Sequence, residues 1–327
     1  MGSSPDTSPA VSPGFLAVFH AHAAADGTMP FARFMELALY HPEVGYYRRD
    51  RPRVGRGPGT DFYTASSSGT VFGELVVHAA AALLRQHGRD PALHTLVEIG
   101  AEPGAGVFTG LALPFRSHRA IRVGEAIDLT GDCVVFSNEL FDAQPCVRTV
   151  RRADGWREIH VQAAAEGFGE VERPAEFFEA APEGYRFDRP LAAAALAGRI
   201  AAQPWRGLFL ALDYGKTARE LLENTPGGTA RAYLRHRQSA DLLARPGEQD
   251  LTCHVCWDWI AGALTDAGFT APAIEFQESF FVRRAAGWLA TAVAADAAQL
   301  TRRKLALMQL LHPGQMGQKF QALHAVR

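Results

Sequence analysis

Polar side chains follow directly on an apolar run near the middle of the chain. The run "DCVVFSNE" (132–139) ends in Asn138 and Glu139, and Asp142 comes three residues later. Ligands of open α/β sheets bind beyond the carboxyl ends of the strands, so this spacing places an amide and two carboxylates where a bound molecule would lie. Capping of a following helix is the alternative interpretation of Glu139 and Asp142, because acidic residues also stabilise helix N-termini.

A glycine-rich turn follows another apolar run, in "LVEIGAEPGAGVF" (96–108). A strand that enters such a turn brings the backbone close to a bound nucleoside. The dinucleotide pattern G-x-G-x-x-G is not met, because Thr109 stands at the third glycine position and Glu102 would repel a pyrophosphate. What remains is a nucleoside ligand without phosphates, such as S-adenosylmethionine, and Glu98 suits its sulfonium and ammonium charges. A tight turn with nothing bound is the alternative.

Two residues that follow a third apolar run have weaker signals. Asp213 and Tyr214 end "GLFLALDYG" (207–215), where they either face a substrate or satisfy a turn. The neighbouring Lys216 does not belong to a phosphate-binding loop, because the first glycine of that motif would fall on Leu210.

Cysteine usage predicts neither a metal site nor a disulfide framework. Cys253 and Cys256 have the spacing of a zinc or redox pair, but no second pair has ligand spacing. Four cysteines are also too few to cross-link a chain of 327 residues. We therefore expect no metal, and a reducing compartment.

The elements that position these residues are predicted from periodicity. The runs 94–100, 132–139 and 207–215 are short and nearly continuously apolar, which is typical of central parallel strands buried on both faces. Helical spacing predicts helices over 31–41 and 71–87. The fold class is therefore α/β.

Further elements extend this core. Alternating runs about Asp154-Gly155 predict a β-hairpin. It opens a smaller lobe inserted at about 147–204. Towards the end of the chain we expect a helix over 257–269, strand structure through Arg283 and a long helix over about 286–311.

The chain divides accordingly into a disordered leader (1–13), N-terminal helices with a cleft loop rich in glycine and proline (14–92), and the core with its inserted lobe (93–327). The net charge of −2 predicts no general attraction to nucleic acid or to anionic membranes. The N-terminus lacks the basic and apolar regions of a secretory signal, and no apolar run reaches the ~20 residues that span a bilayer. We expect a cytoplasmic protein.

Eight motifs, in order from about residue 30 to the last residues, resemble the MidA-like S-adenosylmethionine-dependent methyltransferases, relatives of a mitochondrial complex I assembly methyltransferase. They are "FMELALYHPEVGYY", "GTDFYTASSSGTVFGE", "VEIGAEPGAG", "SNELFDAQP", "LALDYG", "GTARAYLRHR", "PGEQDLTCHV" and "HPGQMGQKFQAL". The resemblance implies a Rossmann-like methyltransferase sheet with an N-terminal helical extension and an added lobe. It also implies S-adenosylmethionine as cofactor and methyl transfer to a protein side chain, which is arginine in the mitochondrial relative.

The same resemblance assigns roles to individual residues. Glycines of the turn match the cofactor loop, residues of the "GTDFYT" motif match the cofactor side of the cleft, and residues of "SNELFD" match the motif that faces the transferred methyl group. These residues are, respectively, Gly100, Gly104 and Gly106; Asp61, Phe62 and Thr64; and Asn138, Glu139 and Asp142. His254 matches a position near the cleft, although a histidine beside apolar residues is often a hydrogen-bonded structural one.

The chain departs from the family pattern in two places. The glycine loop carries an insertion of two residues, and the interval between Gly106 and Asn138 is too short for the usual helix, strand and helix. "RAIRVGEAI" (119–127) is the candidate for the strand, with Glu125 standing in for the acid that binds the ribose hydroxyls.

We expect a methyltransferase that acts on a protein side chain, with a protein substrate or partner and a dimer compatible with the sequence. The alternatives are an inactive descendant that serves as an assembly factor or scaffold, and a binding module for another nucleoside-like ligand.

Overall fold

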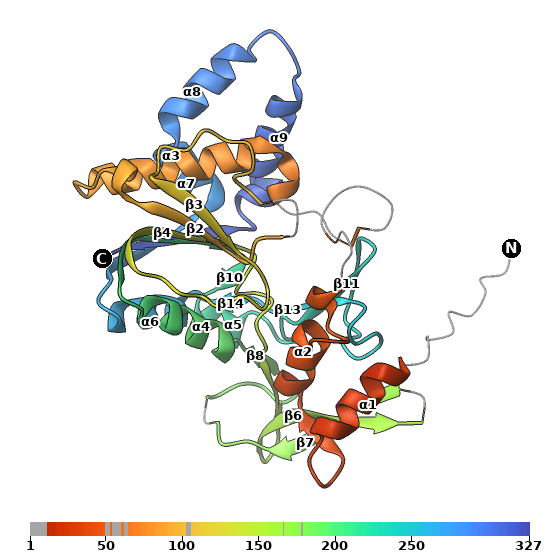
Figure 1. Ribbon diagram of the computed structural model, residues 1–327. Helices are drawn as coiled ribbons and strands as arrows, with labels where there is room; N and C mark the ends of the chain where they lie inside the picture. Colours follow the sequence, from red (N-terminus) through yellow and green to blue (C-terminus); the bar gives the residue numbers. More distant parts are fainter. Residues whose placement is uncertain are drawn as a thin grey trace, which may run out of the picture.

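The main sheet of the computed structural model has the strand order β15-β16-β9-β4-β2-β3 (Figure 1). In chain order its strands are β2 (Thr95–Ile99), β3 (Ser117–Ile121), β4 (Gly131–Asn138), β9 (Trp205–Asp213), β15 (Thr270–Phe276) and β16 (Gln321–Val326). The structure describes residues 12–49, 53, 60–61, 65–102, 106–165, 167–177 and 179–327. This topology confirms the predicted α/β fold.

Strands β2, β4 and β9 correspond to the three apolar runs that the sequence places at the centre of the sheet. They pair in parallel, with Ile99 beside Ser137 and Asn138 beside Leu212, so their carboxyl ends meet at one edge. Both faces of these strands are covered: Phe136 packs into one core cluster and its neighbour Val135 into the other. Burial on both faces explains why the runs are continuously apolar.

Helices cover the two faces of the main sheet. Those that share the core cluster of one face, at the top of Figure 1, are α3 (Thr70–Gln86), α7 (Gln277–Arg284), α8 (Ala286–Ala295) and α9 (Arg302–Leu311). The other face carries α4 (Leu191–Ala201) and α6 (Trp257–Asp266), which contact each other. The expected helices over 71–87 and 257–269 are confirmed. Within the described residues no helix has the length and apolar character needed to cross a membrane.

A second sheet lies at the lower end of the molecule in Figure 1 and forms the lobe. Its order is β1-β6-β5-β8, and β7 pairs with β6 as well. The strands are β1 (Thr28–Pro30), β5 (Val147–Arg152), β6 (Gly155–Ala164), β7 (Gly167–Pro174) and β8 (Arg186–Arg189). The predicted hairpin about Asp154-Gly155 is confirmed, because Arg152 pairs with Gly155 across the β5–β6 turn.

The N-terminal helices pack on this lobe. They are α1 (Pro13–His22) and α2 (Phe31–Tyr40), and the second confirms the helix expected over 31–41. Phe15 and Phe34 both lie edge-on to the ring of Phe168 in β7. Helix α4, which falls inside the interval 147–204, packs instead beneath the main sheet. Residues 1–11 lie outside the described residues, and the division of the chain into domains stays a prediction.

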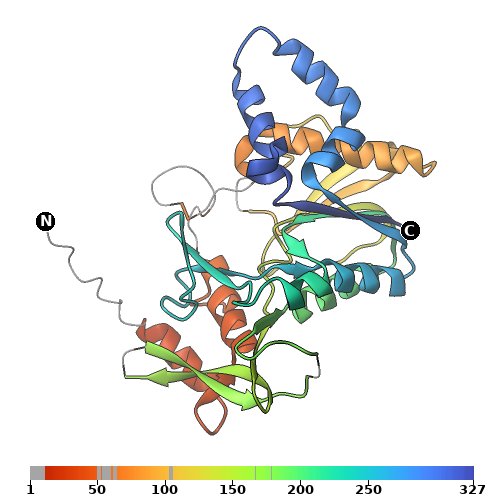
Figure 2. The same ribbon diagram turned by 180° about the vertical axis from the view of Figure 1, so that it is seen from behind.

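A small segment lies between the two larger sheets in both views (Figures 1 and 2). It contains β11 (Arg231–Leu234), β12 (Arg237–Ser239) and β13 (Asp250–Thr252), which pair antiparallel, and β10 (Gly215–Lys216), which pairs in parallel with β14 (Val255–Cys256). Short helical elements are α5 (Ala218–Glu223), η1 (Tyr46–Arg48), η2 (Ala65–Ser68), η3 (Pro91–Leu93) and η4 (Pro313–Gly317).

Two expectations for the last part of the chain are wrong. Strand structure ends at Phe276, where α7 follows directly. The single helix over 286–311 is two helices, as the break at the top of Figure 2 shows. The Thr301 side chain caps α9 by accepting a hydrogen bond from Lys304 N (3.1 Å), and Arg303 binds Asp296 just beyond α8. Thr301 therefore starts a new helix.

Strand β16, which the sequence analysis did not anticipate, lies between β9 and β15 and is antiparallel to both.

The short interval between the glycine turn and β4 keeps its strand. Strand β3 pairs in parallel with β2, but it ends at Ile121, before Glu125. The described part of 106–130 contains turns and no helix. Within its described residues, the interval therefore contains β3 but no helix on either side of it.

Gly207, in the middle of the main sheet, gives a test of this packing. Its φ is +127°, and a Cβ there would lie 2.1 Å from the Cys133 carbonyl oxygen. We expect Gly207→Ala to lower the free energy of unfolding by about 2 kcal/mol or more, because strain and overlap add. The control is Gly262→Ala on α6, where nothing lies within 4 Å. It should be neutral or stabilising by about 0.5–1 kcal/mol. Urea unfolding of both variants measures this, and equal values would contradict the register of β4 and β9.

Candidate active site

A cavity of about 690 Å³ lies at the carboxyl ends of β2, β4 and β9. Residues that follow these strands line it together with residues of the N-terminal helices and of the β11–β14 segment. They include Tyr40, Tyr47, Glu98, Gly100, Glu102, Asn138, Glu139, Asp142, Tyr214, Lys216, Tyr233, Asp250, Thr252, His254, Lys319 and Phe320. The edge of the sheet predicted from the sequence therefore borders an open space.

Glu139 leaves β4 in a strained backbone conformation. Its φ is +51°, a value that side-chain-bearing residues rarely adopt. Its backbone N–H donates to Leu212 O (2.9 Å), and the Asn138 side-chain amide donates to its Oε1 (3.0 Å). Strain of this kind persists only where the surroundings fix it, and it directs the Glu139 side chain to the cavity.

Asp213 fixes the loop that carries Asp142. Its Oδ2 accepts hydrogen bonds from Phe141 N (2.9 Å) and Asp142 N (3.2 Å), and its Oδ1 accepts one from Tyr214 N (2.9 Å). Asp213 is fully buried and does not itself line the cavity. Its position is that of a residue that orients the loop, so the expectation that it faces substrate is corrected. The described residues that follow Asp142 form a turn and then β5, so helix capping does not explain Glu139 or Asp142.

Carboxylates dominate the inner part of the cavity. Burial raises the pKa of Glu139 to about 8, with a further contribution from Asp142, and burial raises the pKa of Asp250 to about 8. Burial also raises the pKa of Asp142 to about 6, although a hydrogen bond from the Tyr214 hydroxyl opposes this shift. The Oδ1 atom of Asp142 accepts no hydrogen bond from any described residue. A cation bound here would stabilise the charged carboxylates.

The glycine turn approaches the same cavity from β2. Gly100 has φ +85°, and a Cβ there would lie 3.1 Å from the Leu140 side chain. Glu98 is buried, and its Oε1 accepts a hydrogen bond from Val107 N (3.0 Å), while its Oε2 accepts none from the described residues. Gly106 lies against this carboxylate, because a Cβ there would be 3.2 Å from Glu98 Oε2. This Oε2 lies 3.5 Å from His118 Nε2. A buried carboxylate oxygen that accepts no hydrogen bond from the described residues suits a ligand with an ammonium group.

Asp61 and Glu125, two residues expected to bind the cofactor, do not line the cavity. Asp61 accepts hydrogen bonds from the Tyr46 hydroxyl (2.7 Å) and from Arg235 N (3.1 Å), so it joins η1 to the β11–β12 turn and does not line the cavity. Glu125 is exposed and accepts a hydrogen bond from Arg122 N (2.8 Å), which closes the turn after β3. The proposed stand-in for the ribose acid is thus held by a local contact. Phe62, Thr64 and Gly104 lie outside the described residues.

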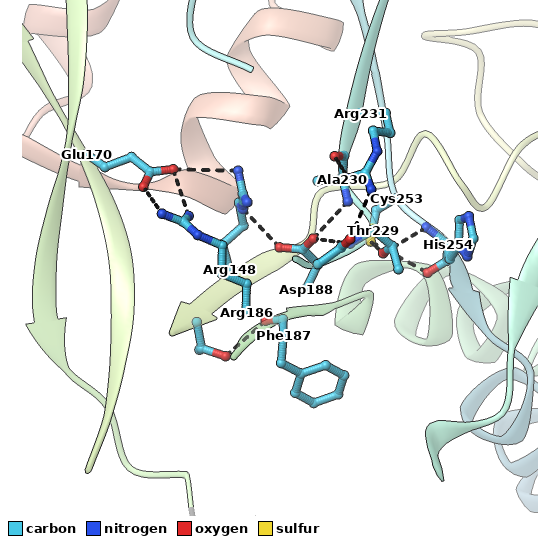
Figure 3. A network of polar contacts seen from close by, with 12 residues as sticks. Arg148, Glu170, Arg186, Phe187, Asp188, Thr229, Ala230, Arg231, Cys253 and His254 are labelled. Carbon is cyan, nitrogen blue, oxygen red and sulfur yellow. Dashed lines mark hydrogen bonds and ion pairs between the residues drawn. The ribbon is translucent and has the colours of Figure 1, made fainter. Parts of the chain in front are cut away.

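A buried polar network connects His254 to the lobe (Figure 3). Asp188 pairs with Arg148 (2.9 Å) and accepts hydrogen bonds from Thr229 N (2.6 Å) and Ala230 N (2.7 Å). The Thr229 hydroxyl in turn accepts one from His254 N (3.3 Å).

The His254 ring lines the cavity, and its Nδ1 has no hydrogen-bond partner among the described residues. Burial, with Lys216 nearby, lowers its pKa to about 4, so it is a neutral imidazole at the cavity wall. Tyr214 also lines the cavity, packed edge-on to this ring (5.5 Å between centroids).

Sequence reasoning assigned no site role to several residues that line the cavity, among them Tyr40, Tyr47 and Asp250. Tyr47 lies in η1 and Asp250 in β13, so neither follows a strand of the main sheet. Asp250 stands in the "PGEQDLTCHV" motif, which was noted for the resemblance only. Because Asp250 follows other polar residues in this motif, the sequence does not indicate that its side chain is buried.

The cysteines are unpaired in the described structure. Cys253 and Cys256 are buried free thiols, as are Cys133 and Cys146. Within the described residues, no group of three histidine, cysteine or acidic side chains is arranged to hold a metal ion.

Comparison with known proteins shows similarity to methyltransferases. Residues 118–274 match a family described as "Putative S-adenosyl-L-methionine-dependent methyltransferase". The zebrafish (Danio rerio) protein arginine methyltransferase NDUFAF7, mitochondrial, is 26% identical over 303 residues, which cover 72% of this chain and 68% of that protein.

A solved structure covers the whole chain. It is described as a "likely methyl transferase from Burkholderia thailandensis bound to S-adenosyl-homocysteine", and it matches with a TM-score of 0.83 at 25% identity, over 100% of this chain and 95% of that one. A native structure from the same organism gives a TM-score of 0.82 at 25% identity over the same shares. In sequence and in fold the chain is therefore similar to the MidA-like S-adenosylmethionine-dependent methyltransferases. Residues of the turn after β2 and of the loop after β4 both line the cavity.

The raised pKa of Glu139 predicts how stability depends on pH. A carboxyl whose pKa is raised from 4.5 to about 8 on folding contributes its full stability below pH 4.5 and loses that contribution as the pH rises towards 8. We expect the free energy of unfolding of the wild type, measured with urea, to fall between pH 5 and pH 8 relative to Glu139→Gln. The expected difference is about 1 kcal/mol or more.

Glu223→Gln on the surface of α5 is the control, because Glu223 makes only a surface pair with Arg219 (3.0 Å). This control should run parallel to the wild type. Parallel curves for Glu139→Gln as well would show that the Glu139 carboxyl is not buried in neutral form.

Proposed function

We propose that this chain binds S-adenosylmethionine at the glycine turn after β2 and methylates the guanidinium group of an arginine in a protein substrate. The observation that carries the proposal is an open cavity whose inner wall holds buried carboxylates, with Asp142 Oδ1 lacking a partner among the described residues. Such a wall favours a cation with several N–H donors over a neutral or anionic acceptor.

The residues of the turn fit the cofactor. Glu98 offers its ammonium group a buried oxygen that accepts no hydrogen bond from the described residues. The absence of side chains at Gly100 and Gly106 leaves space beside Leu140 and Glu98. When bound, S-adenosylmethionine supplies an electrophilic methyl group on a sulfonium. The S-adenosyl-homocysteine in the Burkholderia thailandensis relative supports this assignment.

The acid cluster suits a guanidinium acceptor. Arginine keeps its proton in solution because its pKa exceeds ~12, so it enters the cavity as a cation. A cation next to Glu139 and Asp142 lowers their pKa values, and both carboxylates can then hold its N–H groups. Transfer of the methyl group to a guanidinium nitrogen releases one proton from that nitrogen. Glu139 accepts this proton, because burial raises the pKa of its carboxyl group to about 8 in the empty cavity.

The relatives support the substrate class without fixing it. NDUFAF7 is named a protein arginine methyltransferase, and the chain aligns with about two thirds of it. An inactive scaffold has no need of an open, acidic cavity. We still predict a protein substrate, no nucleic-acid or membrane partner, and an oligomeric state compatible with a dimer. A cytoplasmic location also stays a prediction, and NDUFAF7 is described as mitochondrial.

Cofactor binding is tested first, by calorimetric titration of the wild type, Glu98→Gln and Glu125→Gln with S-adenosylmethionine. Glutamine keeps an acceptor for Val107 N but loses the charge, so Glu98→Gln should raise Kd by about ten-fold or more. Glu125→Gln should leave Kd unchanged, because that side chain is exposed and bound to Arg122 N. Equal weakening by both variants would place the turn after β3 at the cofactor instead.

Methyl transfer is tested with an arginine-containing peptide and mass spectrometry. Asp142→Asn should lower kcat/KM by about 10²-fold or more while S-adenosylmethionine still binds, because only the acceptor side loses a charge. Asp132→Asn, at the far end of β4 in a surface pair with Arg206 (2.9 Å), is the matched control and should retain activity. A wild type that binds the cofactor but leaves the arginine peptide unmodified would refute arginine as the acceptor.

A further inference from the structure

Asp250 brings a carboxylate to the cavity from outside the methyltransferase sheet. It begins β13, where it pairs with Tyr233 of β11, and only 4% of its surface is exposed. The end of β13 is attached to the loop of Asp142, because Cys253 N donates a hydrogen bond to Asp142 O (2.8 Å). The small β11–β13 segment therefore holds Asp250 at a fixed position relative to the carboxylates that follow β4.

Tyr47 fixes the orientation of this carboxylate. Its hydroxyl donates a hydrogen bond to Asp250 Oδ1 (2.9 Å). The Tyr47 ring stacks on Tyr40 with centroids 5.5 Å apart and 16° between the planes, and the Tyr40 hydroxyl donates to Ala143 O (2.9 Å). Two tyrosines from the N-terminal part of the chain thus join Asp250 to the loop after β4.

Nearby cations do not neutralise Asp250 in the described structure. Arg53 lies over the Tyr47 ring at 5.3 Å, but its guanidinium is paired with Glu102 (3.0 Å) and donates to Arg49 O (3.0 Å). The pKa of Asp250 is raised by burial and further by the charges of Asp142 and Glu102, which are both acidic. The site therefore presents carboxylates from two separate elements to one space.

We propose that Asp250, oriented by Tyr47, is a specificity-determining residue that receives the edge of the guanidinium not held by Glu139 and Asp142. This inference rests on the proposed arginine acceptor. A guanidinium carries five N–H donors in a plane, and one carboxylate can engage only two of them. A buried donor without a partner is costly, so a second carboxylate on another edge favours binding. Lysine has a compact ammonium group with no second edge, so the arrangement favours arginine over lysine.

The test compares two peptides that differ only in having arginine or lysine at the central position. Their Kd values are measured by calorimetry in the presence of S-adenosyl-homocysteine, and KM and kcat are measured for the arginine peptide. The variants are Asp250→Asn and Tyr47→Phe. The control is Asp241→Asn, which changes an exposed carboxylate in the same β11–β13 segment.

We expect Asp250→Asn to raise the Kd and KM of the arginine peptide by about ten-fold or more, with a smaller change in kcat. The Kd of the lysine peptide and that of the cofactor should change little, so the preference for arginine falls. Tyr47→Phe should also raise the Kd and KM of the arginine peptide, by a smaller factor. If Asp250→Asn fails to fold, this variant still tests the role of Asp250. Asp241→Asn should match the wild type.

The outcomes separate this inference from the function on which it rests. A wild type that binds both peptides equally would refute the arginine acceptor, and the role of Asp250 with it. A wild-type preference that survives both Asp250→Asn and Tyr47→Phe would overturn the role of Asp250 alone. Equal losses for the arginine and lysine peptides would show that Asp250 only supports the cavity wall.

Discussion

The buried carboxylate of Asp213 holds together the part of the molecule on which the chemistry depends. Its two oxygens accept backbone hydrogen bonds from Phe141, Asp142 and Tyr214, which belong to the segments following β4 and β9. Backbone donors without partners would be costly at this depth, so the carboxylate is what allows two strands to end in non-regular structure inside the protein. The position of Asp142 depends on this arrangement.

Much of this architecture could be predicted from the sequence, for reasons that are local. Strands β2, β4 and β9 are apolar on both faces, and the carboxyl-end rule then located Asn138, Glu139 and Asp142. The functional assignments of Asp61 and Glu125 came from motif position, and hydrogen bonds to Tyr46 and Arg122 place them elsewhere. Motif position alone reveals neither contact.

The remaining features depend on contacts between distant parts of the chain. The hydrogen bond between Tyr47 and Asp250 joins residues separated by 203 positions, and no periodicity encodes it. Strand β16 was missed because its place depends on β9 and β15, and not on a continuous apolar run of its own. The division into two helices near Thr301 was missed because a single capping hydroxyl outweighs the helical periodicity around it.

The two sides of the cavity have different origins in the fold. The main sheet supplies the glycine turn and the loop after β4, whereas the N-terminal helices and the β11–β14 segment supply the tyrosines, Asp250 and His254. Asp188 of the lobe, which pairs with Arg148, joins the lobe to this second group by accepting a hydrogen bond from Thr229 N (Figure 3). Changes in the added segments can therefore alter the acceptor without disturbing the nucleoside side.

The crowding of acids around this cavity has a thermodynamic consequence for any cation that enters it. With pKa values of about 8 for Glu139 and Asp250, the empty protein stores protons on these groups at neutral pH. An incoming positive charge expels some of them into the medium. The heat of association then contains the ionisation enthalpy of the buffer, and its variation between phosphate and Tris counts the protons released. Binding of a cation in the cavity is therefore coupled to the release of protons from Glu139 and Asp250.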